Sequence, residues 1–277
     1  MKFLIKITFA SLLIWAMFGC QNQTVSNSAS KTNSNVPANN ANNTSQSNTE
    51  TPAPQTIKFE SADKVEIVGA FYQSPKENSP AVLMLHQWES NRQSYDEFAK
   101  RLQAKNFGVL AIDGRGFGES VKTTDSATVA TNRGDETVKG MKSDVDNAFN
   151  FLAKQKNVDA QKIGIVGASY GSSLAIIYAV ENPKVKAVAL LSPGLNYFGN
   201  MPTEPAVKNY GNRPLLLVAA EDDKESADAV RKLKEANATD KYKVKIFEKG
   251  GHGTGLFKAK VGFEDLLEEF LTKSLAQ

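Results

Sequence analysis

Ser169 lies at the centre of the segment Gly167-Ala168-Ser169-Tyr170-Gly171, the part of the sequence best suited to covalent chemistry. A β-rich apolar run precedes this segment and a helical run of small residues follows it, which predicts a strand, a sharp turn and a helix. Glycines two residues to either side of the serine allow strand and helix to approach closely. The amides that open the helix could hold an acyl oxyanion, so the pattern favours a nucleophilic serine. The motif alone is weak, and an inert serine in a turn is the alternative.

A serine hydroxyl needs a base, and the sequence contains two histidines, His86 and His252. Histidine is the side chain best matched to proton transfer near neutral pH. His86 ends an apolar run, where we expect it to hold loop backbone. His252 lies in a glycine-rich loop that can be placed freely, which favours it as the base. His86 as the base, and an ordinary loop role for His252, both stay open.

The third residue of such a site is a carboxylate that orients the imidazole. One acidic cluster, Glu221-Asp222-Asp223, lies between Ser169 and His252, directly after an apolar run. This position agrees with the chain order serine, acid, histidine that accompanies such a serine turn. The residues alone do not choose between Asp222 and Asp223. A carboxylate here could also simply occupy the first turn of a helix.

The elements that must position these side chains alternate along the chain. Apolar runs predict strands at 81–86, 107–112, 185–191, 214–220 and 243–247, and helical spacing marks 95–102, 141–154, 226–236 and 263–271. Two β-rich runs, 57–60 and 65–72, predict an antiparallel hairpin at a sheet edge. We therefore expect an α/β fold with a doubly wound, mostly parallel sheet, whose ligands bind at the carboxyl ends of the strands.

Three loops are less informative. Residues 121–137 and 192–213 have no readable pattern, although aromatic residues such as Tyr197 and Phe198 could line a pocket or simply pack. The segment DGRGFGES at 113–120 holds three glycines. It matches neither the dinucleotide fingerprint nor the P-loop, so we do not expect nucleotide binding.

Taken together, residues 57–277 resemble the α/β-hydrolase superfamily, and most closely its dienelactone hydrolase-like and small serine esterase branch without a large lid. The matching segments are LMLHQW at 83–88, DGRGFGES at 113–120, GASYG at 167–171, LLLVAAEDD at 215–223 and GGHG at 250–253. The resemblance implies that Ser169 is the nucleophile, His252 the base and Asp223 the acid. It also implies that the backbone amides of Tyr170 and Trp88 bind the oxyanion, and that no metal or cofactor is needed.

Two residues depart from the family pattern. Gln87 stands where the family usually has glycine, so the first oxyanion loop could differ in shape. Ser169 stands where dienelactone hydrolases proper have cysteine, which favours hydrolysis of carboxylic esters through an acyl-enzyme. Peptidase or acyltransferase chemistry on the same residues is an alternative. An inactive scaffold that binds an envelope ligand is another.

The N-terminal residues have the pattern of a targeting segment. Lys2 and Lys6 precede an apolar run at 7–18, which is shorter than the about 20 residues of a membrane span. We interpret residues 1–19 as a signal peptide. Cys20 follows Gly19 and is the only cysteine, an arrangement that resembles the lipobox of bacterial lipoproteins and implies acylation of Cys20. Met17 and Phe18 differ from the usual lipobox residues, and ordinary secretion is the alternative.

Residues 20–56 are interpreted as the lipidated cysteine and a disordered tether, because the Asn, Ser and Thr-rich stretch cannot bury enough apolar surface to fold. The lipoprotein resemblance implies an extracytoplasmic protein anchored in a bacterial membrane, and Gln21 suggests the outer membrane or cell surface. The 277 residues include 33 basic and 30 acidic ones, a balance that gives no reason to expect nucleic acid. The expected partner is a small-molecule ester or acyl substrate, and the sequence does not indicate an oligomeric state.

Overall fold

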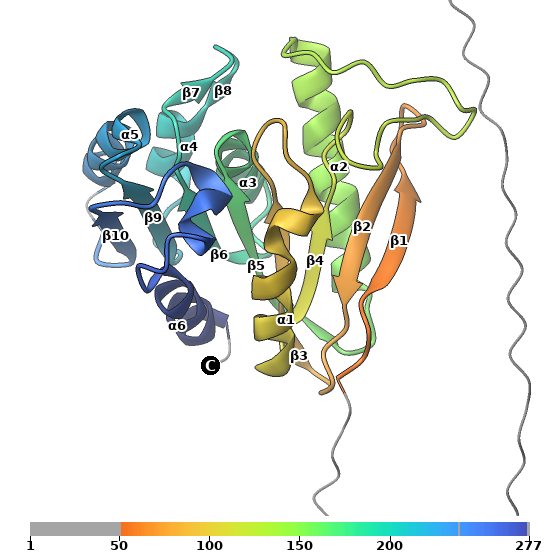
Figure 1. Ribbon diagram of the computed structural model, residues 1–277, viewed down its shortest axis with the longest axis horizontal. Coiled ribbons are helices and arrows are strands. Elements are labelled where there is room, and N and C mark those ends of the chain that lie inside the picture. The colour runs from red at the N-terminus through yellow and green to blue at the C-terminus, as the bar shows by residue number, and fades with distance from the viewer. Residues whose placement is uncertain (1–50, 238, 276–277) are drawn as a thin grey trace, which may run out of the picture. The chain divides into compact units, whose positions relative to one another are not determined.

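The computed structural model describes residues 51–237 and 239–275 (Figure 1). The predicted signal peptide, Cys20 and the tether up to residue 50 lie outside these residues. The first strand, β1 (Gln55–Glu60), begins two residues before the predicted start of the domain. Gln55 and Thr56 pair with Phe71 and Ala70 of the next strand, so their backbone belongs to the sheet although their side chains carry no apolar signal.

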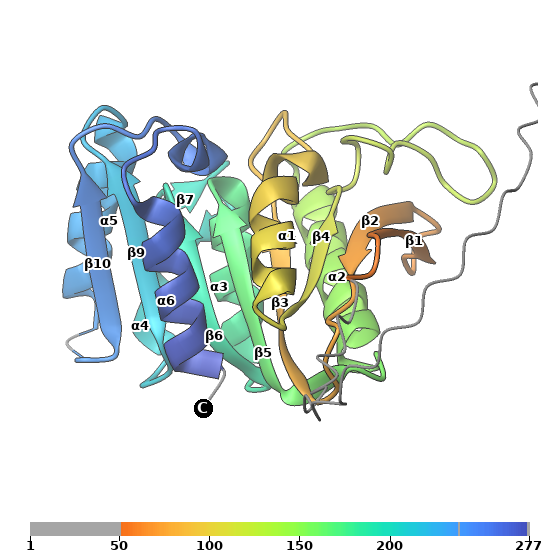
Figure 2. The same ribbon diagram turned by 60° about the horizontal axis from the view of Figure 1, so that its bottom comes forward.

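An eight-stranded sheet runs through the described residues (Figures 1 and 2). Its strand order is β1-β2-β4-β3-β5-β6-β9-β10. The strands are β1, β2 (Glu66–Tyr72), β4 (Gly108–Ile112), β3 (Ser79–Leu85), β5 (Val158–Ala168), β6 (Val185–Leu191), β9 (Leu215–Ala220) and β10 (Tyr242–Phe247). β2 pairs antiparallel with β1 and with β4, and every later pair is parallel. The predicted fold class, with its antiparallel N-terminal hairpin, is confirmed.

Helices cover both faces of the sheet (Figure 2). One face is packed by α1 (Asp96–Ala104) and α6 (Phe263–Leu275), the other by α2 (Asp135–Ala153), α3 (Tyr170–Glu181), α4 (Thr203–Asn209) and α5 (Lys224–Glu235). Because both faces of the central strands are covered, these strands are apolar over most of their length. β9, for example, is buried at every residue from Leu215 to Ala220. The continuous apolar runs were therefore sufficient to predict these strands.

Two segments differ from the sequence-based expectation. Helix α2 begins at Asp135 rather than near Met141. Its first turn is exposed and acidic, which suits a helix N-terminus but presents no apolar face to detect. The stretch 192–213 contains a short hairpin, β7 (Asn196–Tyr197) and β8 (Met201–Pro202), followed by α4. Such short elements are set by tertiary contacts and leave no periodic pattern.

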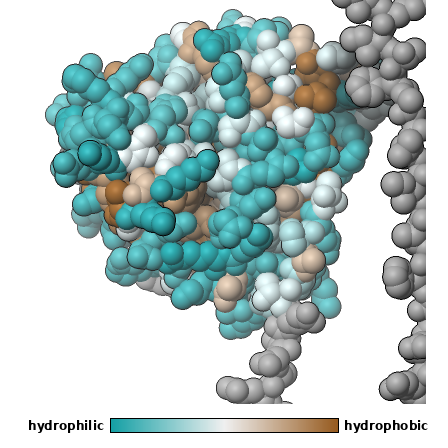
Figure 3. Space-filling view, viewed as in Figure 1, coloured by the Kyte–Doolittle hydropathy of each residue, from teal (hydrophilic) through white to brown (hydrophobic). Residues whose placement is uncertain are grey.

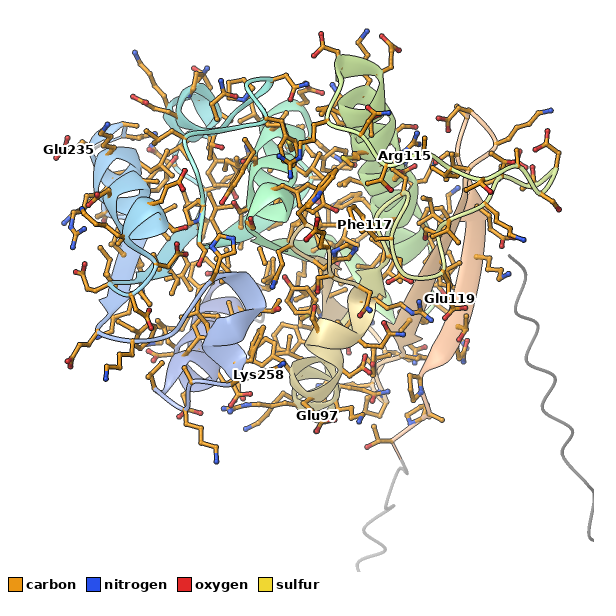
Figure 4. All side chains as sticks on the ribbon, turned by 45° about the horizontal axis from the view of Figure 1, so that its top comes forward. Glu97, Arg115, Phe117, Glu119, Glu235 and Lys258 are labelled. Carbon is orange, nitrogen blue, oxygen red and sulfur yellow. The ribbon has the colours of Figure 1, made fainter. Side chains whose placement is uncertain are left out.

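The charged side chains of the 113–120 loop form internal ion pairs. Asp113 is fully buried and accepts hydrogen bonds from the amides of Arg92 at 2.7 Å and Glu119 at 2.8 Å. Arg115 donates to both carboxylate oxygens of Asp144, at 2.7 and 2.8 Å. Figure 4 shows Arg115 beside α2, with Phe117 closer to the centre of the molecule. These charges anchor the loop that follows β4.

The surface shown in Figure 3 is mainly hydrophilic, and its hydrophobic residues form separate small patches. None of the helices in the described part of the chain is long and apolar enough to cross a bilayer.

Candidate active site

Ser169 occupies a strained turn between β5 and α3. Its backbone has φ 54° and ψ −124°, in the positive-φ region that residues with a side chain rarely adopt. An ideal Cβ on Gly167 would stand 2.1 Å from the Gly171 carbonyl oxygen, so the turn closes only with glycine at position 167. The predicted strand, turn and helix are confirmed. The Ser169 amide donates to the Leu191 carbonyl at 2.8 Å, which fixes the turn against β6.

His252 and Asp223 are paired in the structure. The His252 Nδ1 atom lies 2.7 Å from an Asp223 carboxylate oxygen, and the Asp223 side chain is 14% exposed. Burial acts to raise the pKa of Asp223, but the hydrogen bond with His252 and the nearby Ser226 and Ser192 hydroxyls outweigh it and hold that pKa below its ordinary value. An ionised carboxylate therefore faces the imidazole at neutral pH.

The neighbouring Asp222 has a different role. Its carboxylate accepts hydrogen bonds from the Gly250 amide at 3.1 Å and the Gly251 amide at 3.0 Å. Asp222 therefore fixes the backbone of the glycine-rich loop, and Asp223 is the carboxylate that contacts His252.

Ser192 supports this pair, although no motif or spacing in the sequence pointed to it. Its Oγ atom accepts a hydrogen bond from the Gly253 amide at 2.8 Å, and its hydroxyl acts to lower the pKa of Asp223. Ser192 is fully buried and has φ 48°, another strained position at the end of a central strand. It connects the acid to the loop of the histidine.

The loop after His252 packs directly on the serine turn. An ideal Cβ on Gly253 would stand 3.5 Å from the Cβ of Ala168, the residue before Ser169. Gln87 also contacts the loop after His252, because its Oε1 accepts hydrogen bonds from Thr254. The segments that carry the predicted nucleophile and base therefore lie against each other.

His86 has a structural role. Its Nε2 accepts a hydrogen bond from the Gly114 amide at 2.8 Å, and its Nδ1 lies 2.7 Å from the Gln87 carbonyl oxygen. Burial lowers the pKa of His86, so the ring is held neutral. Because backbone groups contact both ring nitrogens, His86 is not available as a base. This agrees with the structural role expected for it.

The two predicted oxyanion donors lie at the carboxyl ends of β3 and β5. Tyr170 is the first residue of α3, where an amide has no partner within the helix. Among the described residues, neither the Tyr170 amide nor the Trp88 amide donates a backbone hydrogen bond in the loops and caps. Both amides can therefore donate to a substrate oxygen.

Aromatic rings surround this end of the sheet. The Trp88 ring lies edge-to-face against Phe117, Tyr170 and Phe198, with centroid distances of 4.8, 5.5 and 4.9 Å. The Tyr197 hydroxyl donates to the Ser192 carbonyl at 3.0 Å. Burial raises the pKa of Tyr197, against an opposing effect of the nearby Ser169 hydroxyl. Ser169 itself is only 5% exposed.

Within residues 51–237 and 239–275, no cluster of three or more His, Cys, Asp or Glu side chains is arranged to hold a metal ion.

Solved structures with a similar fold include several esterases. The esterase Pf2001 of Pyrococcus furiosus has a TM-score of 0.65 and 17% identity, covering 80% of this chain and 93% of that chain. Acetyl xylan esterase 1 from Thermoanaerobacterium sp. has a TM-score of 0.64 and 18% identity, covering 79% and 83%. Dienelactone hydrolase from Anabaena variabilis has a TM-score of 0.62 and 19% identity, covering 82% and 100%. These likenesses define the α/β-hydrolase fold.

The chain belongs to the Dienelactone hydrolase family, which matches residues 68–260. Among curated relatives, Rv2307c of Mycobacterium tuberculosis is 29% identical over 143 residues, 51% of this chain and 46% of that protein. Acyltransferase drtE of Aspergillus calidoustus is 25% identical over 146 residues, 52% of this chain and 44% of that protein. The chain thus spans about half the length of the relatives it matches.

Proposed function

We propose that this protein is a serine hydrolase that cleaves carboxylic esters through an acyl-enzyme. The observation that carries the proposal is the pair of His252 Nδ1 and the Asp223 carboxylate, 2.7 Å apart, beside the strained turn of Ser169. In this mechanism Ser169 Oγ attacks the ester carbonyl while His252 Nε2 takes its proton, and Asp223 stabilises the resulting imidazolium. The amides of Tyr170 and Trp88 stabilise the oxyanion.

The second half of the reaction uses the same groups. His252 returns its proton to the leaving alcohol and then removes a proton from water, which attacks the acyl-enzyme. The bond between the acyl carbon and Ser169 Oγ breaks, His252 gives the proton back to Oγ, and the acid leaves. The fully buried Ser192 holds the loop of His252 against Asp223 during both steps.

Substitution of the nucleophile tests the proposal. We expect Ser169→Ala to lower the turnover of p-nitrophenyl acetate and butyrate by several orders of magnitude, because the three side chains act as a unit. Ser94→Ala, a substitution in the 3₁₀ helix Arg92–Tyr95 that precedes α1, is the matched control and should retain wild-type turnover. A fluorophosphonate probe should label the wild type and not Ser169→Ala. Equal hydrolysis by wild type and Ser169→Ala, or no labelling of the folded wild type, would rule out the serine mechanism.

Acyl transfer on the same residues is a second candidate, favoured by the similarity to acyltransferase drtE. An alcohol or amine added to the assay should then divert the acyl group from water. Product analysis by mass spectrometry measures this partition, and acid as the sole product at high acceptor concentration argues for hydrolysis alone.

The N-terminal anchor is also a proposal, supported by the charged start, the short apolar run and Cys20. Acylation of Cys20 after removal of residues 1–19 would hold the hydrolase at an extracytoplasmic membrane surface. Mass spectrometry of the N-terminal peptide from the native membrane fraction tests this, because an unmodified cysteine or an intact signal peptide contradicts it.

A further inference from the structure

The Gln87 side chain joins two loops of the candidate site that are far apart in the sequence. Its Oε1 accepts hydrogen bonds from the Thr254 amide at 2.9 Å and from Thr254 Oγ1 at 2.8 Å. Thr254 is 6% exposed, so these bonds are shielded from solvent. Gln87 directly precedes Trp88, and Thr254 follows His252 by two residues. The bonds therefore tie the loop of the proposed oxyanion amide to the loop of the proposed base.

The carboxamide of Gln87 fits closely into its surroundings. An ideal Cβ on Gly253 would stand 2.7 Å from Gln87 Oε1 and 3.5 Å from the Cβ of Ala168, and Gly253 has a φ of +58°. Gly253 thus packs against both the carboxamide and the residue before Ser169. The family resemblance leads to the expectation of glycine at position 87, which could make neither hydrogen bond to Thr254.

The loop after His252 is held by two consecutive amides. The Gly253 amide donates to Ser192 at the end of β6, and the Thr254 amide donates to Gln87 after the end of β3. Removal of the Gln87 acceptor leaves a buried amide and a buried hydroxyl without their partner. Since buried polar groups require partners, the loop must shift to find new ones.

We propose that Gln87 is a positioning residue, which fixes the Trp88 amide and the His252 imidazole relative to each other. This inference rests on the proposed function. In the transition state the Trp88 amide acts on the carbonyl oxygen while His252 acts on the proton of Ser169, so their mutual placement affects kcat more than KM. A misplacement of about 1 Å can cost about 100-fold in rate.

Truncation of the side chain tests the role. We expect Gln87→Ala to lower kcat for p-nitrophenyl acetate by about 10- to 100-fold, with KM changed by no more than about threefold. The matched control is Gln103→Ala, because Gln103 is also buried and bridges two segments through the Pro52 and Gln73 carbonyls, both at 2.9 Å. This control should keep the wild-type kcat. The double variant Gln87→Ala/Thr254→Ala should be no slower than Gln87→Ala, because the Thr254 hydroxyl has already lost its partner in Gln87→Ala.

A second measurement reports the bridge without using activity. Amide hydrogen exchange at Thr254 should be faster in Gln87→Ala than in the wild type. The positioning role would be overturned if amide exchange at Thr254 or kcat were unchanged in Gln87→Ala. It would also be overturned if Gln103→Ala lost as much kcat, or if the losses of kcat were additive in the double variant. Ester hydrolysis lost in Ser169→Ala but retained in Gln87→Ala would refute only this inference. Hydrolysis retained in Ser169→Ala would refute the proposed function, while the exchange of Thr254 would still test the bridge.

Discussion

The same substitution at two adjacent aspartates should have different effects on catalysis. Asp223→Asn and Asp222→Asn each replace a carboxylate by a carboxamide of the same shape. The Asp223 carboxylate lies 2.7 Å from His252 Nδ1. In Asp223→Asn the carboxamide carries no charge there, and it can present its NH₂ group to a nitrogen that is itself a donor. In Asp222→Asn the remaining carbonyl oxygen can still accept from the Gly250 and Gly251 amides. We therefore expect only Asp223→Asn to impair catalysis.

The size of the effect follows from the burial of the pair. Opposite unit charges about 4 Å apart interact by about 4 kcal/mol at an effective dielectric constant of about 20. That environment suits Asp223, whose side chain is 14% exposed. A charge-assisted hydrogen bond contributes about 1.5–3 kcal/mol. Loss of about 3–4 kcal/mol from the transition state corresponds to a fall in kcat of about 10²–10³.

Asp222→Asn should leave kcat within about threefold of the wild type and lower the unfolding free energy by about 1 kcal/mol or less, because its hydrogen bonds lie at an exposed position. Steady-state kinetics with p-nitrophenyl acetate and urea unfolding of both variants provide the comparison. Equal losses of kcat in the two variants, or wild-type kcat in Asp223→Asn, would refute the reasoning about which carboxylate orients the imidazole.

The low pKa of Asp223 extends this prediction to pH. A carboxyl group whose pKa is depressed by folding contributes stability above its unfolded pKa of about 3.9, and that contribution is lost as the pH falls through the folded value. Asp223→Asn should therefore be less stable than the wild type at pH 5 to 7, and the difference should shrink below about pH 4. Urea unfolding of both proteins at pH 3, 5 and 7 measures this difference in unfolding free energy. A difference that persists at pH 3 would contradict the lowered pKa of Asp223.

Two further predictions concern the scaffold. Gly167→Ala should lower the unfolding free energy by about 1–3 kcal/mol and abolish most activity, because its Cβ would meet the backbone of α3 at 2.1 Å. Gly134→Ala, whose Cβ would meet only a side chain at 3.2 Å, should match the wild type in both assays, and similar losses in the two variants would contradict the argument. Arg115→Met should cost about 3–5 kcal/mol in urea unfolding, because it leaves the buried Asp144 carboxylate unpaired. Asp63→Asn, at the 56% exposed partner of Arg115, should cost about 1 kcal/mol or less, and an equal loss would show that the Arg115–Asp144 pair contributes little.

Much of the fold could be predicted because a doubly wound sheet produces local signals. Strands buried on both faces are continuous apolar runs, and each amphipathic helix repeats apolar residues at its own period. The predicted site residues share another local signal, since Ser169 directly follows β5 and Asp223 follows β9 by three residues. Side chains at the carboxyl ends of parallel strands meet at one edge of the sheet. This rule placed Ser169, the acidic cluster at 221–223 and His252 at one edge of the sheet, and the family resemblance then favoured Asp223 over Asp222.

The rest of the site could not be predicted, because it depends on contacts between distant segments. Ser192 lies at the end of β6 like many inert serines, and its strained φ of 48° has no sequence signature. Gln87 was recognised only as a departure from a family pattern, and its partner Thr254 lies 167 residues away. A single hydrogen bond between such distant residues leaves no periodic pattern in the sequence, so neither composition nor spacing reveals it.

These contacts also explain how the candidate site keeps its geometry although its groups come from separate loops. The Gly114 amide after β4 bonds to His86, whose other ring nitrogen contacts the Gln87 carbonyl. The Gln87 side chain then binds the loop that follows β10. The next link joins that loop to Ser192 at the end of β6, and Ser192 in turn interacts with Asp223 after β9. These side chains thus connect the ends of β3, β4, β6, β9 and β10. Few of these bonds contribute to the apolar core, so their loss should lower kcat more than it lowers the free energy of unfolding. Substitution of core residues, such as those of β9, should instead lower mainly the free energy of unfolding.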